Sequence, residues 1–104
     1  MPPQFVGTEA KITRSMISEG SMILGTVEHS VIFPGVRVGK GAVVRNSVLL
    51  PSAVVADGAV VDYAILAQHA VIEEGAQVIG EESQITVIPE GETVTAASTE
   101  QRVG

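Results

Sequence analysis

Aliphatic residues recur through the middle of the chain at intervals of five or six positions, and three intervals make a repeat of 17 residues. The repeat is clearest over 32–78, where each interval opens on Ile, Leu or Val and a small residue follows three or four places later. The first repeat is shorter, at 15 residues. The openings fall into three columns: Ile17/Ile32/Leu49/Leu66, Ile23/Val38/Val55/Ile72 and Ile12/Val27/Val44/Val61/Val78.

This pattern indicates short strands stacked as a parallel β-helix. The apolar positions do not keep the i, i+3, i+4, i+7 spacing of a helix, and the many β-branched residues favour strands. With three sides per turn, a triangular cross-section would bring the three columns inward and leave the small residues for tight corners. One turn buries too little apolar surface to order itself, so we expect an all-β domain of about four to five stacked coils.

The pattern also divides the chain. Residues 1–10 contain Pro2, Pro3 and Gly7 and are interpreted as an extended linker that enters the domain. The β-helix is predicted for 11–94. Residues 80–84 interrupt the repeat with a polar loop, and 85–94 are expected to add a strand pair over the last coil. Residues 95–104 are small and polar and are expected to form a tail.

One outward face stands out because it is almost wholly apolar. The residues next to the column that contains Leu49 are expected to point outward, and a contiguous apolar surface on a small acidic domain favours a docking role. The predicted interface residues are Met16, Val31, Phe33, Val48, Leu50 and Ile65.

Charged residues suggest a second, weaker candidate site. Arg37, Lys40 and Arg45 lie in one coil and form a basic cluster that could bind an anionic effector; the alternative is that they only keep the surface solvated. A neighbouring outward column, Glu28/Arg45/Asp62, alternates in sign and is interpreted as a solvated face with weak ion pairs. Gly41, Gly58 and Gly75 recur at corner positions, which explains them without a phosphate-binding loop.

Composition excludes several classes of function. A net charge of −6 argues against nucleic-acid binding, and the absence of Cys removes disulfides and thiolate metal sites. His29 and His69 fall in different columns, so we expect no metal site. No apolar run is long enough for a membrane span and no signal peptide is recognisable, which favours a cytoplasmic protein. A β-helical acyltransferase remains an alternative, although no long loop interrupts 27–78.

The order of several motifs resembles one family. These motifs are Pro2-Pro3-Gln4-Phe5-Val6, the Ser-Glu-Gly coil within 15–31, Phe33-Pro-Gly-Val-Arg-Val-Gly39 and Asn46-Ser-Val-Leu-Leu-Pro51. In this order, from about residue 2 to 94, they are similar to the C-terminal domain of bacterial glucose-1-phosphate adenylyltransferases. The resemblance implies a left-handed β-helix, a handedness that the periodicity itself does not reveal.

The resemblance also implies a parent enzyme that makes ADP-glucose and pyrophosphate from ATP and glucose 1-phosphate in glycogen synthesis. Its N-terminal nucleotidyltransferase domain, which carries the Mg²⁺ site, would precede the linker, so we expect this domain to need no cofactor and to be non-catalytic alone. The family implies packing on that catalytic domain, assembly of a homotetramer, and a share in sites for sugar-phosphate activators or AMP.

Three alternatives stay open. Asp57 and Asp62 occupy a coil that is arginine-rich in some activator-responsive members, which puts sugar-phosphate activation through that coil in doubt. The parent could equally be the catalytically reduced regulatory subunit that forms hetero-oligomers with an active sister subunit. It could also be another sugar-nucleotidyltransferase, such as a mannose-1-phosphate guanylyltransferase.

Overall fold

Short parallel strands in three sheets make up the molecule. The computed structural model describes residues 5–8, 10–96 and 100–101, and none of these lies in an α-helix. Sheet A contains β1 (Phe5–Val6), β4 (Met22–Ile23), β7 (Arg37–Val38), β10 (Val54–Val55), β13 (Val71–Ile72) and β16 (Thr93–Val94). Sheet B contains β2 (Lys11–Thr13), β5 (Thr26–Glu28), β8 (Val43–Arg45), β11 (Val60–Asp62), β14 (Gln77–Ile79) and β17 (Glu100–Gln101). Sheet C contains β3 (Met16–Ile17), β6 (Val31–Ile32), β9 (Val48–Leu49), β12 (Ala64–Leu66) and β15 (Thr86–Ile88).

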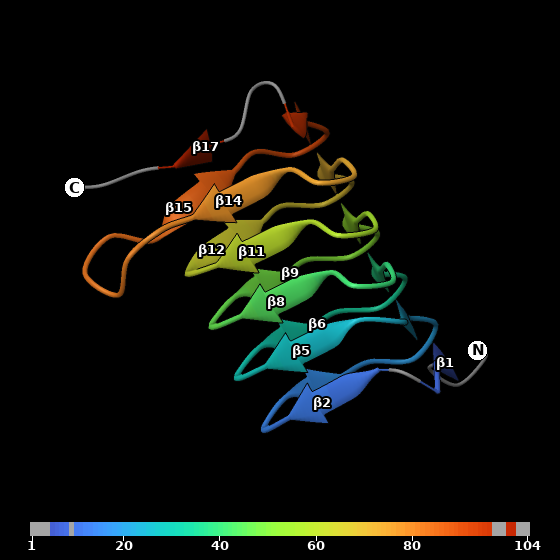
Figure 1. Ribbon diagram of the computed structural model, residues 1–104. Coiled ribbons are helices and arrows are strands. Elements are labelled where there is room, and N and C mark those ends of the chain that lie inside the picture. Colours follow the sequence, from blue (N-terminus) through green and yellow to red (C-terminus); the bar gives the residue numbers. More distant parts are fainter. Residues whose placement is uncertain (1–4, 9, 97–99, 102–104) are drawn as a thin grey trace.

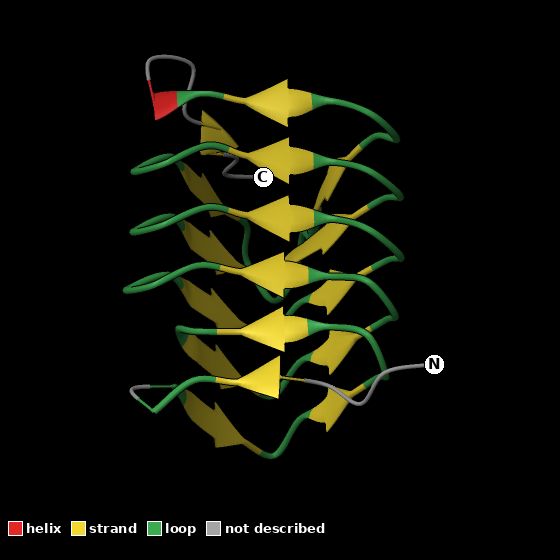
Figure 2. Ribbon diagram, turned by 90° about the vertical axis from the view of Figure 1, so that its right-hand side faces the viewer, coloured by secondary structure: helices red, strands yellow, loops and turns green. Residues whose placement is uncertain are grey.

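The chain visits the sheets in the order B, C, A and climbs one rung with every circuit, which gives the stack in Figure 1. Figure 2 shows sheet A in front, with its strands running from right to left while the chain rises from its N-terminal to its C-terminal end. This sense of winding makes the helix left-handed. The predicted all-β, left-handed parallel β-helix is therefore confirmed.

The three predicted columns form the core. Eleven of their thirteen residues have no solvent exposure, and Ile12 and Ile17 are partly buried against the others. Both of these lie in the first coil, where no complete coil below shields them. Alanines fill the space beside the columns near the corners, for example Ala42, Ala59 and Ala76, which are also fully buried. Small side chains are needed there because the chain turns tightly while the neighbouring aliphatic groups point inward.

The turns differ in length only at their corners. Met16 pairs with Val31, an offset of 15 residues, whereas Val31 pairs with Val48, an offset of 17. In the last coil Ala64 pairs with Thr86, an offset of 22 that includes the predicted polar loop. The short first turn and the additional strand pair at 85–94 are both confirmed, since β15 and β16 continue sheets C and A.

Regular structure extends beyond the expected limits of the domain. Phe5 and Val6, which were assigned to the linker, form β1 and pair with β4. Glu100 and Gln101, assigned to the tail, pair with β14. Each segment satisfies the backbone groups of an otherwise unpaired edge strand, which explains why short and irregular sequences join the sheets. The remaining parts of the predicted linker and tail, 1–4, 9, 97–99 and 102–104, lie outside the described residues.

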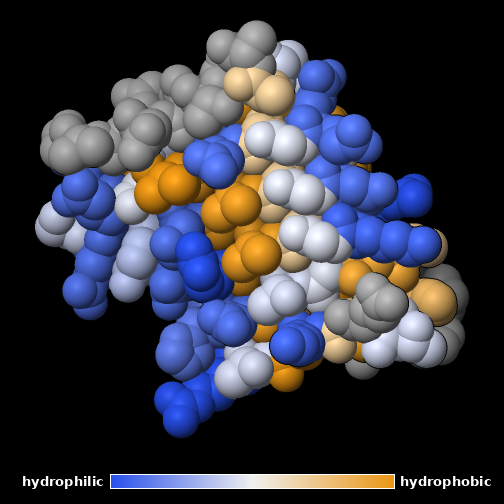
Figure 3. Space-filling model, in the orientation of Figure 1, coloured by the Kyte–Doolittle hydropathy of each residue, from blue (hydrophilic) through white to orange (hydrophobic). Residues whose placement is uncertain are grey.

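The outward residues give each sheet a different surface. Sheet B, which faces the viewer in Figure 3, mixes charged side chains with a smaller apolar patch, because its outward positions include Glu28, Arg45 and Asp62 beside Val43 and Val60. The register places Glu28 opposite Arg45 and Arg45 opposite Asp62, as the alternating column predicted. Arg45 and Asp62 form an ion pair of 3.7 Å.

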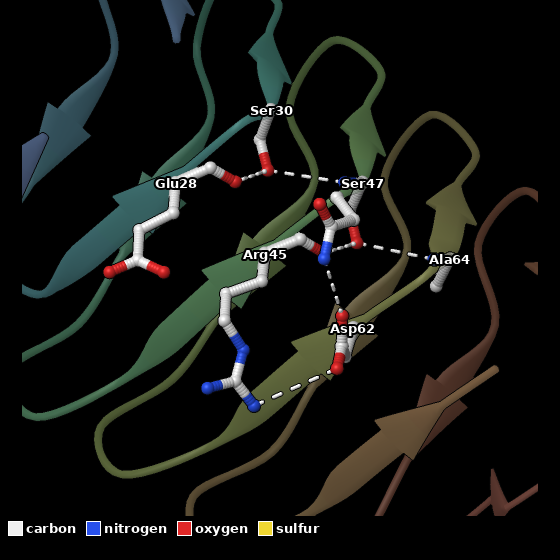
Figure 4. A network of polar contacts seen from close by, with 7 residues as sticks. Glu28, Ser30, Arg45, Ser47, Asp62 and Ala64 are labelled. Carbon is white, nitrogen blue, oxygen red and sulfur yellow. Dashed lines mark hydrogen bonds and ion pairs between the residues drawn. The ribbon is translucent and has the colours of Figure 1, made fainter. Parts of the chain in front are cut away.

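A ladder of serine hydroxyl groups connects successive coils at the corner between sheets B and C (Figure 4). The Ser30 N–H donates to Ser15 Oγ at 3.0 Å, the Ser47 N–H to Ser30 Oγ at 3.1 Å, and the Ala64 N–H to Ser47 Oγ at 3.2 Å. Ser30 and Ser47 are buried, so each hydroxyl satisfies an N–H group that water does not reach. The ladder ends at Ala64, and the buried Thr86 hydroxyl in the next coil has no partner.

The corner glycines explain themselves through their backbone angles. Gly41, Gly58 and Gly75 have φ values of 71°, 72° and 75°, a region that side chains with a Cβ rarely adopt. A Cβ added to Gly58 would meet no atom within 4 Å, so any cost of a substitution there comes from the backbone conformation alone.

We therefore expect Gly58→Ala to lower the free energy of unfolding by about 1 to 2 kcal/mol, the cost of a left-handed conformation for a residue with a Cβ. Gly58→Asn should cost clearly less, because asparagine tolerates this region, as Asn46 does here at φ 50°. Urea unfolding of both variants measures the difference. Equal losses would contradict the assignment of the cost to backbone conformation.

The serine ladder leads to a second prediction. Ser47→Ala would leave the buried Ala64 N–H without an acceptor, and we expect a loss of about 1 to 3 kcal/mol in the free energy of unfolding. Ser83→Ala, in the exposed loop, is the matched control and should change stability by less than about 0.5 kcal/mol. Chemical denaturation measures both, and a Ser47→Ala variant as stable as the control would refute a structural role for the ladder.

Candidate docking face and anion-binding corner

An apolar surface covers the outside of sheet C. Met16, Val31, Val48, Ile65 and Val87 stand in register, one residue on each strand. With the adjacent Phe33 and Leu50 they form what we call face C. All six residues that the sequence analysis assigned to an interface lie on this face.

The exposure of face C is greatest at its two ends. Met16 is 71% exposed and Val87 is 57% exposed, while the central residues are partly shielded by their neighbours along the ladder. Val87 was absent from the predicted interface because the last turn has 22 residues instead of 17. The interruption of the repeat after Gly80 was the signal that could have revealed the shift.

A short loop borders the C-terminal end of face C. Residues 80–85 project from the corner between β14 and β15, as Figure 1 shows in orange. The loop is closed by two backbone hydrogen bonds, from Glu81 N–H to the Gln84 carbonyl at 3.0 Å and from Gln84 N–H to the Glu81 carbonyl at 2.9 Å. Ile85 is 40% exposed beside it, and Glu81 and Glu82 are exposed, so this end of the apolar face has an acidic rim.

The three predicted effector-binding residues do not converge on one point. Arg37 points outward from sheet A, Lys40 lies at the corner between sheets A and B, and Arg45 points outward from sheet B. Arg45 is engaged by Asp62, whose other carboxylate oxygen accepts from Asn46 Nδ2 at 3.2 Å (Figure 4). The geometry therefore keeps Arg37 and Lys40 as near neighbours and separates Arg45 from them.

Lys40 lines a cavity at the corner between sheets A and B. The cavity has a volume of about 310 Å³, and its walls come from Phe5, Gly7, Thr8, Leu24 and Lys40. Within the described residues the Lys40 side chain forms no ion pair. The nearby Asp57 carboxylate instead accepts the backbone N–H of Lys40 at 3.0 Å. This corner therefore combines apolar walls, a hydroxyl group and a cation.

The two histidines lie at different corners. His29 is at the corner between sheets B and C and His69 at the corner between sheets C and A, with φ values of 48° and 62°. Among the residues that the structure describes, no group of three or more His, Cys, Asp or Glu side chains could hold a metal ion. A search of the same residues finds no helix with the length and hydrophobicity needed to cross a bilayer.

Comparison with known proteins supports the resemblance noted in the sequence. The family described as GlmU-like, C-terminal hexapeptide matches residues 2–97. The glucose-1-phosphate adenylyltransferase of Geobacillus stearothermophilus is 54% identical over 44 residues, which are 42% of this chain and 11% of that protein. That of Thermotoga neapolitana is 56% identical over 45 residues, or 43% and 11% of the two chains.

A related protein with a different name is similar to the same degree. The glycogen biosynthesis protein GlgD of Geobacillus stearothermophilus is 56% identical over 43 residues, which are 41% of this chain and 12% of that protein. The matched part of the chain thus spans only 11 to 12% of the length of these relatives. Because the family match covers nearly all of the sequence and the observed β-helix agrees with it, the chain belongs to the GlmU-like C-terminal hexapeptide family.

Proposed function

We propose that this chain is the β-helix domain of a glucose-1-phosphate adenylyltransferase, with a regulatory and assembly role and no catalytic activity of its own. The observation that carries the proposal is the identity of about half the aligned residues with enzymes of that name. The reaction of ATP with glucose 1-phosphate, and the Mg²⁺ that it needs, are assigned to a nucleotidyltransferase domain of the same polypeptide.

Face C supports the assembly role. A ladder of five apolar residues on a domain with a net charge of −6 is most simply explained as a surface that another part of the protein covers. We propose that the catalytic domain packs on face C and that this contact positions the domains for assembly into an oligomer, a homotetramer in the simplest case.

The effector role is assigned to the side of the molecule that carries Arg37 and Lys40. A sugar phosphate or AMP would find two cations there, whereas Arg45 is already paired. The two aspartates that put activation in doubt have local partners, since Asp62 binds Arg45 and Asp57 accepts from the Lys40 backbone. Both carboxylates lower the local positive potential, which favours effector binding at the Arg37 and Lys40 side over the Arg45 side.

A second candidate function follows from the similarity to the glycogen biosynthesis protein. In that case the parent would be a regulatory subunit that joins an active sister subunit in a hetero-oligomer. The β-helix and face C would serve the same assembly role, and only the activity of the attached domain would differ.

We expect the native polypeptide that contains this sequence to be several times heavier than the 10.8 kDa of this chain and to release pyrophosphate from ATP and glucose 1-phosphate. Intact-mass measurement and a pyrophosphate assay on the purified protein test this. A large protein without activity that restores activity to a sister subunit would indicate the regulatory subunit instead. A native protein of only this mass would refute both candidates.

The docking role of face C predicts a specific mutational effect. In the native polypeptide, Val48→Asp should weaken subunit assembly by at least about tenfold, since a carboxylate on the face would have to lose its water when the face is covered. Val54→Asp, at an outward position of sheet A, should leave assembly unchanged. Sedimentation velocity across a dilution series measures the dissociation constant, and equal effects of the two variants would contradict docking through face C.

A further inference from the structure

The second coil is short because its corner between sheets A and B lacks two residues. The hydrogen bond from Leu24 N–H to the Val38 carbonyl aligns Leu24 with Gly39, and the bond from Thr26 N–H to the Ala42 carbonyl aligns Gly25 with Ala42. The second coil therefore has no equivalents of Lys40 and Gly41. Figure 2 shows the result, because the loop after the second-lowest front strand is visibly shorter than those above it.

The short corner is kept tight by Gly25. A Cβ at this position would overlap the carbonyl oxygens of Gly39 and Ala42 in the coil above. No larger side chain can therefore fill the gap from within the second coil. The gap coincides with the cavity of about 310 Å³ lined by Phe5, Gly7, Thr8, Leu24 and Lys40, which we call the corner notch.

The missing residues leave a backbone donor without its usual acceptor. In the regular coils, Gly58 N–H donates to the Lys40 carbonyl at 2.9 Å, and Gly75 N–H donates to the Asp57 carbonyl at 3.1 Å. Gly41 occupies the same place one coil earlier, but the residue that would accept its N–H does not exist. Its N–H makes no hydrogen bond to the described residues and faces the corner notch.

The opposite wall has the complementary group. Thr8 is the equivalent of Lys40 and Asp57 in the first coil, because Ala10 N–H closes that corner on the Gly7 carbonyl as Ala42 N–H does on the Gly39 carbonyl. Its carbonyl would accept from an equivalent of Gly41 in the second coil, and no described residue donates to it. The donor and the acceptor are two rungs apart, about 9 to 10 Å.

What the gap lacks is a single peptide group, with an acceptor oxygen toward Gly41 and a donor toward Thr8. A ligand that carries an acceptor and a donor on neighbouring atoms would restore both bonds. The Lys40 ammonium, which has no carboxylate partner among the described residues, adds a preference for a negatively charged acceptor. Phe5 and Leu24 supply apolar walls against which the carbon skeleton of a small molecule can pack.

We propose that the corner notch is a binding site for a small hydroxylated anion, whose anionic oxygens accept from Gly41 N–H and the Lys40 ammonium and whose hydroxyl donates to the Thr8 carbonyl. The anionic group can be a phosphate or a carboxylate, since both offer this chemistry. The inference rests on the effector part of the proposed function and deepens it by giving the site a place and a set of contacts; it does not depend on docking through face C.

Amide resonances in two-dimensional ¹H–¹⁵N spectra test the proposal on the 104-residue chain. Glycerol 3-phosphate and glycerate serve as phosphate and carboxylate probes, and neutral glycerol is the control. We expect a saturable shift of the Gly41 amide with at least one anionic probe and none with glycerol. The resonances of Gly58 and Gly75 are internal controls, because their N–H groups are already bonded to the coil below. If no anion shifts Gly41, or if all three glycines shift alike, the proposal is wrong.

Two substitutions sharpen the test. Lys40→Ala, at an exposed position, should raise the dissociation constant of the effective probe about tenfold. Arg14→Ala makes the same change in charge at the corner between sheets B and C and should alter the constant less than about twofold, because exposed charges far from the site are screened. Equal effects of the two substitutions would indicate attraction by net charge and would overturn a specific site. Failure here would leave the mass, activity and assembly tests of the proposed function unaffected.

Discussion

Every part of this structure depends on the requirement that one coil hydrogen-bonds in register with the next. A two-residue strand such as Val54–Val55 has almost no stability by itself, and it persists because β7 and β13 pair with it on both sides. The same register places side chains of one kind above one another, so that buried aliphatic residues meet aliphatic residues along the whole stack. Backbone pairing and core packing therefore reinforce one another, and neither survives without the other.

This coupling explains why so much of the fold could be predicted. A column of inward residues leaves a strict period in the sequence, and the positions of residues such as Val44 and Val61 followed from it directly. Handedness did not, because a period of 17 is compatible with either sense of winding; it came from the family resemblance. The strand at Phe5–Val6 was missed because two residues are too short to show a pattern, and their pairing depends on an edge that only exists after the rest has folded.

The candidate sites were less accessible to sequence reasoning. Face C followed from the period up to Ile65, and then failed at Val87, where the longer last turn shifts the numbering without shifting the geometry. The basic residues were grouped because they are close in sequence, yet a chain that turns a corner every few residues sends such neighbours to different sheets. Serine hydroxyls that hold corner N–H groups, and an N–H that loses its acceptor, depend on which residue lies one coil away, and a linear reading does not test for that.

The differences in turn length carry a broader consequence. Turns of 15, 17 and 22 residues coexist in one stack, and the strands above and below each of them stay in register. Length changes are confined to the corners, where closing a somewhat longer loop costs little conformational entropy. A β-helix of this kind can therefore gain or lose surface features by small insertions and deletions while its core sequence stays under separate constraint. Related domains that share one scaffold could diverge in what they recognise by changing a few corner residues.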